Sequence, residues 1–260
     1  MEETVLKIAF VVIGLIIGSF LNVVICRLPL EKSIVKPGSH CPNCLTPVKA
    51  YDNIPVLSYI LLLGKCRQCK TKISLQYPAV EIFTAFTFWL VYISWAPLHV
   101  HVVFSAIFLC LLIALALIDY QHMMLPLELS IGGAVLFLIY SFFNPLHSPA
   151  PLDAFLSATG AALFFAFIYV FYLKVRKIEG LGQGDIWMML LLGSFLGVNK
   201  LIVAILLASF AGSIVGIFVM ITKKKNLQTQ LPFGTFLSFG AYVSFFWGIE
   251  ILTFIQSLYR

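Results

Sequence analysis

Residues 8–25 read IAFVVIGLIIGSFLNVVI, an apolar run that contains no charged residue. As an α-helix this run would be about 27 Å long, close to the ~30 Å of hydrocarbon that a membrane helix must cross. Similar runs recur to the end of the chain, so that 61% of the 260 residues are hydrophobic, only 11% are charged and the mean hydropathy is +1.01. A soluble domain of this size needs more polar surface. The sequence therefore predicts an integral membrane protein.

The pattern of apolar runs predicts an all-α polytopic fold with about eight transmembrane helices. No small-residue cleavage site follows the first run before Arg27, so we expect a membrane helix there and not a removed signal peptide. The organisation expected is a first transmembrane helix (1–26), a small insert (27–78) and a membrane-embedded domain (79–260). The predicted spans are residues 6–26, 79–96, 101–118, 128–143, 153–173, 186–198, 200–221 and 233–254.

The lysines and arginines behind the net charge of +6 are distributed unevenly between the two sides of the predicted membrane. If the N-terminus lies outside, only Lys7, Lys200 and Arg260 of the 17 lysines and arginines fall on the outer side. Cationic loops are retained in the cytoplasm, and this includes the basic loop Lys223 to Lys225. The positive charge therefore indicates orientation in a lipid bilayer, and we expect no nucleic-acid partner.

The insert contains two Cys-x-x-Cys pairs separated by 21 residues. Pairs of this kind close four thiolates around Zn²⁺, which would make the insert resemble a zinc ribbon. Since the predicted topology places the insert in the reducing cytoplasm, two disulfides are the weaker alternative; reduced, metal-free thiols are another. The predicted ligands of a structural Zn²⁺ are Cys41, Cys44, Cys66 and Cys69.

Two acidic residues stand apart from the others in the chain. Asp119 follows the span 101–118 where it emerges into the cytoplasm, and Asp185 precedes the span 186–198, so both are predicted at one depth on one face. Two neighbouring carboxylates do not readily ionise together, and the pair can act as base and acid in peptide hydrolysis. The alternative is that each acid only caps a helix end. Gly182 and Gly184, which precede Asp185, favour the first interpretation because they let an extended peptide approach the backbone closely.

Nine segments of the chain match the pattern of a known family in the same order. They are Gly18 to Val24, Arg27 to Pro29, Ser39 to Cys44, Asn53 to Tyr59, Gly64 to Cys69, Tyr77 to Glu81, Ile118-Asp119, Gly182 to Asp185 and Pro232 to Thr235. Through these segments the chain resembles the type IV prepilin peptidases, intramembrane Gly-x-Gly-Asp aspartyl proteases of the bacterial inner membrane. One departure is that the family usually has Leu-Pro-Asp after the first catalytic aspartate, whereas this chain has Leu-Pro-Leu followed by Glu128.

The resemblance implies cleavage of a short basic leader from prepilins or secretion pseudopilins at the cytoplasmic membrane surface. It implies Asp119 and Asp185 as the catalytic pair, and residues 79–260 as the peptidase domain. It also implies N-methylation of the new terminus with S-adenosylmethionine as methyl donor. Gly64 and Lys65 are the candidate residues for this second activity, which no nucleotide-binding motif of the chain indicates independently.

Three alternatives remain open. The chain could be a peptidase without methyltransferase activity. It could be another Gly-x-Gly-Asp protease of the preflagellin or signal-peptide peptidase type, although those lack such a cysteine insert. It could also be a membrane scaffold or transporter with a structural zinc ribbon, in which case neither aspartate is needed for peptide processing.

Overall fold

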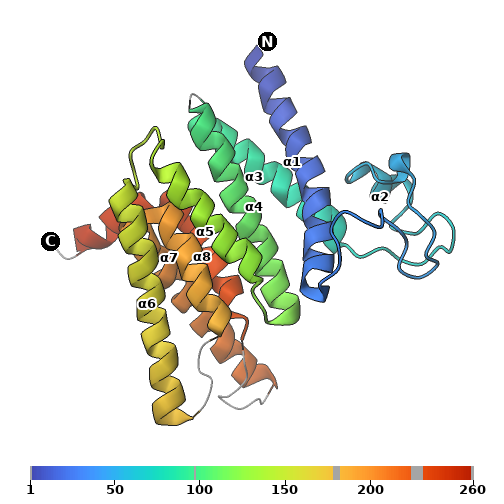
Figure 1. The fold of residues 1–260 in the computed structure, drawn as a ribbon. Coiled ribbons are helices and arrows are strands. Elements are labelled where there is room, and N and C mark those ends of the chain that lie inside the picture. Colours follow the sequence, from blue (N-terminus) through green and yellow to red (C-terminus); the bar gives the residue numbers. More distant parts are fainter. Residues whose placement is uncertain (1, 97, 178–181, 224–230, 259–260) are drawn as a thin grey trace. The chain divides into compact units, whose positions relative to one another are not determined.

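A computed structural model describes residues 2–96, 98–177, 182–223 and 231–258 (Figure 1). Lys224, Lys225 and Arg260, which enter the charge argument above, lie outside these residues. The described residues form helices and no strand, as predicted. The chain divides into two compact units, Met1–Ala106 and Ile107–Arg260, which are called unit 1 and unit 2 below.

The helices coincide with the predicted apolar runs. Six of those in the described chain are long and apolar enough to cross a membrane, and a further helix, α5, is shorter. Unit 1 contains α1 (Glu2–Arg27), the short α2 (Leu57–Leu61) and α3 (Gln76–Trp95); α4 (His99–His122) belongs to unit 2 from Ile107 onward; unit 2 continues with α5 (Leu127–Ser141), α6 (Pro151–Arg176), α7 (Gln183–Lys223) and α8 (Phe233–Leu258).

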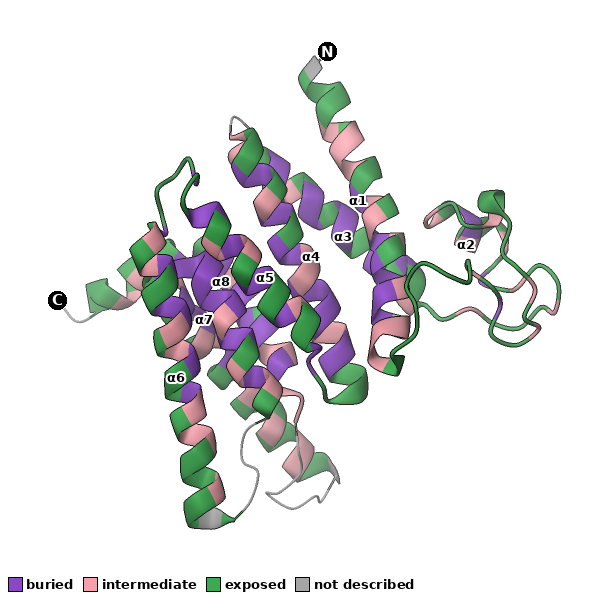
Figure 2. Ribbon diagram, in the orientation of Figure 1, coloured by how far each residue is buried: buried purple, intermediate pink, exposed green. Residues whose placement is uncertain are grey.

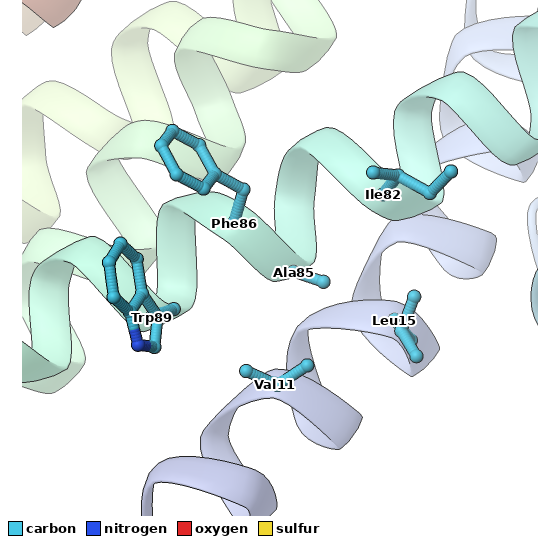
Figure 3. Close-up of a pocket in the computed structure, with 6 residues that line it drawn as sticks. All are labelled: Val11, Leu15, Ile82, Ala85, Phe86 and Trp89. Carbon is cyan, nitrogen blue, oxygen red and sulfur yellow. The ribbon is translucent and has the colours of Figure 1, made fainter.

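In unit 1, α1 and α3 cross at two glycines. A Cβ on Gly14 would lie 2.6 Å from the Cα of Ala85, and a Cβ on Gly18 would lie 2.7 Å from the Cα of Glu81. Small residues spaced by four allow such close contact between membrane helices. Figure 3 shows the apolar pocket beside this crossing, lined by Val11, Leu15, Ile82, Ala85, Phe86 and Trp89.

The 41 residues of α7 are interrupted at Gly197, whose backbone has φ 68° and ψ 174°. Residues with a Cβ rarely adopt this conformation. Before the interruption α7 runs antiparallel to α6, because Gly193 lies against Ala158 and Gly197 lies against Asp153. From Met188 to Leu196 every residue of α7 except the half-buried Leu190 is buried, which makes the first part of α7 the central helix of unit 2 (Figure 2).

After the interruption α7 runs antiparallel to α8. The Lys200 carbonyl accepts a hydrogen bond from the Ser244 hydroxyl, well along α8, whereas Gly212 lies against Phe236 near the start of α8. The starts of α7 and α8 are themselves neighbours, since both contact Leu125. The chain therefore reverses at the interruption and returns to the level where α7 began. This agrees with the two separate spans predicted at 186–198 and 200–221.

Aromatic rings fill the centre of unit 2. The ring of Phe108 on α4 stacks on that of Phe195 on α7 at 4.3 Å, and Phe137 of α5 lies 4.7 Å from Phe195. Large apolar side chains also cover the outside, notably along α6, where Leu163 and Phe167 are 70% and 68% exposed (Figure 2). An exposed apolar surface around a packed core is what a protein surrounded by lipid requires.

Candidate active site and candidate metal site

Asp119 lies in the last turn of α4 and is only 5% exposed. Its Oδ2 accepts the backbone N–H of Thr235 at 2.7 Å, and the Thr235 hydroxyl lies 3.1 Å from the same oxygen. Thr235 is in the first turn of α8, where backbone N–H groups have no partner within their own helix. Asp119 therefore caps α8 from another helix, at the positive end of the α8 dipole.

Asp185 lies in the first turn of α7 and is also 5% exposed. Its Oδ2 accepts the backbone N–H of Gly182 at 3.2 Å, and its own N–H donates to the Gly182 carbonyl at 3.2 Å. This reciprocal pair is similar to a capping box. A Cβ on Gly182 would lie 3.2 Å from the Asp185 carboxylate, so the loop passes close to the acid. Both acids therefore accept backbone N–H groups at helix starts, as the helix-cap alternative predicted.

Leu125 links the surroundings of the two acids. A Cβ on Gly184 would lie 2.8 Å from the Cβ of Leu125, and a Cβ on Gly234 would lie 2.9 Å from its Cδ1 and 3.1 Å from Asp119 Oδ2. The starts of α7 and α8 and the end of α4 thus bring both carboxylates into one small region of unit 2, while their catalytic role stays a prediction.

A pair of buried carboxylates can divide the work of hydrolysis. Because two like charges at close range oppose each other, one carboxyl group retains a proton while the other is ionised. The ionised group can take a proton from water, and the protonated group can give one to an oxygen that becomes negative. The helix starts supply N–H donors that orient both groups.

Glu128, the acid beside the departure from the family pattern, lies at the start of α5. It is exposed in the first turn of α5, whereas Leu125 and Pro126 before it are buried. An acid in the first turn of a helix is favoured by the helix dipole. The segment thus contributes the Leu125 side chain to the neighbourhood of the acids, and Glu128 to a helix start.

The four cysteines of the two pairs converge in unit 1. Their Sγ atoms all lie within 4.8 Å of one another, with 3.7 Å between Cys41 and Cys69 and 3.9 Å between Cys44 and Cys66. Each is a free thiol, so the disulfide alternative does not hold. The cluster could hold a metal ion.

The two cysteine pairs have the same local structure. Each is followed by a threonine whose carbonyl accepts the N–H of the first cysteine and whose hydroxyl lies 3.3 Å from the second; these are Thr46 and Thr71. The side chain of Thr71, together with its backbone, lowers the pKa of the Cys69 thiol to about 5. The thiolate is the form that binds metal.

Gly64 and Lys65, the candidates for methyl transfer, lie between these pairs. Gly64 has φ 65°, and a Cβ there would lie 2.8 Å from the Tyr59 hydroxyl, which itself donates to the Ile73 carbonyl. Lys65 is exposed. The glycine is explained by this turn, and neither residue identifies a pocket for S-adenosylmethionine, so their role stays a prediction.

Thr235 is the site residue that sequence reasoning missed. The segment Pro232 to Thr235 contributed to the resemblance, but it received no role. The available signal was a Pro-x-Gly-Thr directly before an apolar run, which is typical of a helix start with free N–H groups. Nothing local in the sequence indicates that Asp119, 116 residues away, is the acceptor.

The structure thus defines a class: a helical membrane protein with a buried carboxylate pair and a separate four-cysteine cluster. Residues 12–95 match the family model described as Bacterial Peptidase A24 N-terminal domain, and residues 106–217 match the Type IV leader peptidase family. The two matched ranges therefore cover most of the chain, including both acids and all four cysteines of the cluster.

Curated relatives named "Prepilin leader peptidase/N-methyltransferase" are similar over most of the chain. That of Pseudomonas putida is 33% identical over 92% of this chain and 90% of the relative, and that of Legionella pneumophila is 34% identical over 94% and 93%. That of Myxococcus xanthus is 39% identical over 81% of this chain, but the match spans 62% of the relative's length. No solved structure matches the chain. The chain belongs to the type IV leader peptidase family and is an enzyme of that family.

Proposed function

We propose that this enzyme cleaves the short basic leader of type IV prepilins or pseudopilins at the cytoplasmic membrane surface, with Asp119 and Asp185 as the catalytic pair. The observation that carries the proposal is that two buried carboxylates lie at the starts of α8 and α7, and that both helix starts contact Leu125. The names of the relatives support the choice of substrate.

Hydrolysis uses the two acids in opposite protonation states. The ionised carboxylate removes a proton from a water molecule, whose oxygen attacks the carbonyl carbon of the scissile bond. The protonated carboxyl group gives its proton to the carbonyl oxygen. When the tetrahedral intermediate collapses, the C–N bond breaks and the leaving amine takes a proton from the group that removed one from water. The new carboxyl group of the product returns the other proton to the group that had protonated the carbonyl oxygen, so both acids are back in their starting states.

The location of the acids suits a substrate that stays in the membrane. Asp119 and Asp185 lie at helix ends, whereas the aromatic core around Phe108 and Phe195 occupies the middle of unit 2. An apolar substrate helix beside the enzyme would present its leader junction at that level without extraction from lipid. The excess of lysine and arginine in the predicted cytoplasmic loops supports an outside N-terminus and a cytoplasmic site.

Methylation of the new N-terminus is the second part of the proposal. It is supported by the names of the relatives, which imply S-adenosylmethionine as methyl donor. The residues that would bind this donor are not identified by Gly64 and Lys65. We therefore assign the activity without a residue-level step.

The four-cysteine cluster is proposed to hold a structural Zn²⁺. Tetrahedral Zn–S bonds of about 2.3 Å require sulfur separations of about 3.8 Å. The observed separations of 3.7 and 3.9 Å fit this geometry. Because four thiolates fill the coordination shell, the ion would hold the two turns of the insert together, and Cys41, Cys44, Cys66 and Cys69 would be its ligands.

The test is mass spectrometry of a purified prepilin incubated in detergent with wild type, Asp119→Asn or Asp185→Asn, in the presence of S-adenosylmethionine. Asparagine keeps the size of each acid but cannot act as the base. We expect loss of the leader and addition of one methyl group with wild type, and a loss of cleavage of at least about 1,000-fold with either variant. Glu128→Gln is the matched control, because Glu128 is exposed at a helix start, and it should cleave normally.

The outcomes separate the parts of the proposal. Normal cleavage by Asp119→Asn would refute the two-aspartate mechanism. Leader loss without methylation by wild type would leave the peptidase and remove the methyltransferase. Absence of cleavage by wild type as well as by the variants would refute the proposed substrate.

A further inference from the structure

The hydroxyl group of Thr235 has two partners. Its Oγ1 lies 3.1 Å from Oδ2 of Asp119 and 3.0 Å from the carbonyl oxygen of Ala116, which is one turn earlier on α4. The backbone N–H of Thr235 donates separately to the same Oδ2 at 2.7 Å. One residue at the start of α8 therefore contacts both the acid and the helix that presents it.

A hydroxyl group has one hydrogen to donate and lone pairs with which to accept. When Asp119 is ionised, the Thr235 hydroxyl can donate its hydrogen to Oδ2. When Asp119 is protonated, the acid can donate to Oγ1 while the hydroxyl hydrogen turns to the Ala116 carbonyl. Both arrangements use the distances already present, so no heavy atom has to move.

From this geometry we propose that Thr235 is a positioning residue of the peptidase, whose hydroxyl holds Asp119 in place in both of its protonation states. The proposal rests on the proposed function, because it deepens the role of Asp119. Since Thr235 binds Oδ2, the other carboxylate oxygen, Oδ1, is the one assigned to the attacking water. A general base must hold its direction toward water through both proton transfers.

The competing explanation is that Thr235 only caps and packs the start of α8. That role belongs to its backbone N–H, which every substitution except proline preserves, and to its branched shape, which valine reproduces. Thr235→Val therefore removes the hydroxyl group and little else, whereas Thr235→Ser restores it without the methyl group.

The experiment compares leader cleavage by wild type, Thr235→Val, Thr235→Ser and Thr253→Val, with kcat and KM measured separately. Thr253 is the matched control, because it lies exposed near the other end of α8 and its hydroxyl donates locally, to the Glu250 carbonyl. We expect Thr235→Val to lower kcat about 10- to 100-fold, the loss typical of a hydrogen bond to a charged group, while KM stays within about threefold. Thr235→Ser and Thr253→Val should retain kcat within about threefold.

Full kcat with Thr235→Val, or equal losses with valine and serine, would overturn the proposal. Thermal unfolding of each variant tests folding, and if the valine variant does not fold, Thr235→Ala compared with Thr235→Ser decides by the same criterion. Cleavage by wild type together with full activity of Thr235→Val would reject the positioning role of Thr235 and leave the proposed function standing. Absence of cleavage by wild type, or normal cleavage by Asp119→Asn, would instead reject the proposed function, and the role of Thr235 with it.

Discussion

Replacing Gly193 by alanine should force α6 and α7 apart. The Cβ would lie 2.5 Å from both the N and Cα atoms of Ala158, and these backbone atoms cannot turn away as a side-chain end could. Ordinary van der Waals contact begins at 3.4 Å, so the shortfall is 3.4 minus 2.5, about 0.9 Å. The same crossing carries a hydrogen bond from the Ser157 hydroxyl to the Gly193 carbonyl at 3.0 Å, which the separation would lengthen.

The expected magnitude follows from this shortfall. Overpacking of a close contact costs about 1–3 kcal/mol, which should lower the midpoint of thermal unfolding by about 2–10 °C. Gly193 lies about two turns beyond Asp185 on α7, so part of the displacement should reach the acid. A misplacement approaching 1 Å can reduce catalysis by about 100-fold.

The assay is thermal unfolding in one detergent together with the rate of leader cleavage. Gly160→Ala is the matched control, because Gly160 lies on α6, the helix that Gly193 contacts, and a Cβ there meets no atom within 4 Å. Removing a glycine from a helix interior should stabilise the protein by about 0.5–1 kcal/mol. If Gly193→Ala were as stable and as active as Gly160→Ala, the close packing of α6 on α7 would be wrong.

Two further predictions concern the cysteine cluster. Cys66→Ser should reduce bound zinc from about one ion per chain to none, as measured by elemental analysis of the purified protein. The control Cys110→Ser, in α4, should leave the zinc content unchanged, and equal zinc in both variants would refute the proposed site. After chelation at pH 6, Cys69 should be alkylated before the other three thiols. Its pKa of about 5 means that this thiol is ionised above about pH 5 and protonated below it, so it is mostly thiolate at pH 6. Thr71→Val should slow this reaction by raising the Cys69 pKa, and peptide mass spectrometry that showed no preference for Cys69 would contradict the role of the Thr71 hydroxyl.

The parts of the structure that depend on local composition could be predicted from the sequence. Apolar runs identify membrane helices because hydrocarbon excludes nearly everything else. The two cysteine pairs are close in sequence, and their convergence required no knowledge of the rest of the fold. The separate spans at 186–198 and 200–221 could likewise be predicted, because Asn199 and Lys200 interrupt two apolar runs that are each long enough to form a helix.

Contacts between distant segments could not be predicted in the same way. Leu125 lies against Gly184 and Gly234, which are 59 and 109 residues further along the chain. A leucine in a short linker has no sequence feature that distinguishes this position from lipid contact. The partnership of Thr235 with Asp119 was missed for the same reason, since it depends on how α4 and α8 pack.

The reversal at Gly197 limits how this part of the chain can change in length. The two arms of α7 are joined there almost without a loop, so each arm sets the rotation of the other about its axis. One inserted residue would turn the second arm by about 100° and move Ala204 and Ala208 away from Gly240 of α8. Insertions and deletions should therefore accumulate in the other connections of unit 2, while the length of this hairpin stays constant among related enzymes.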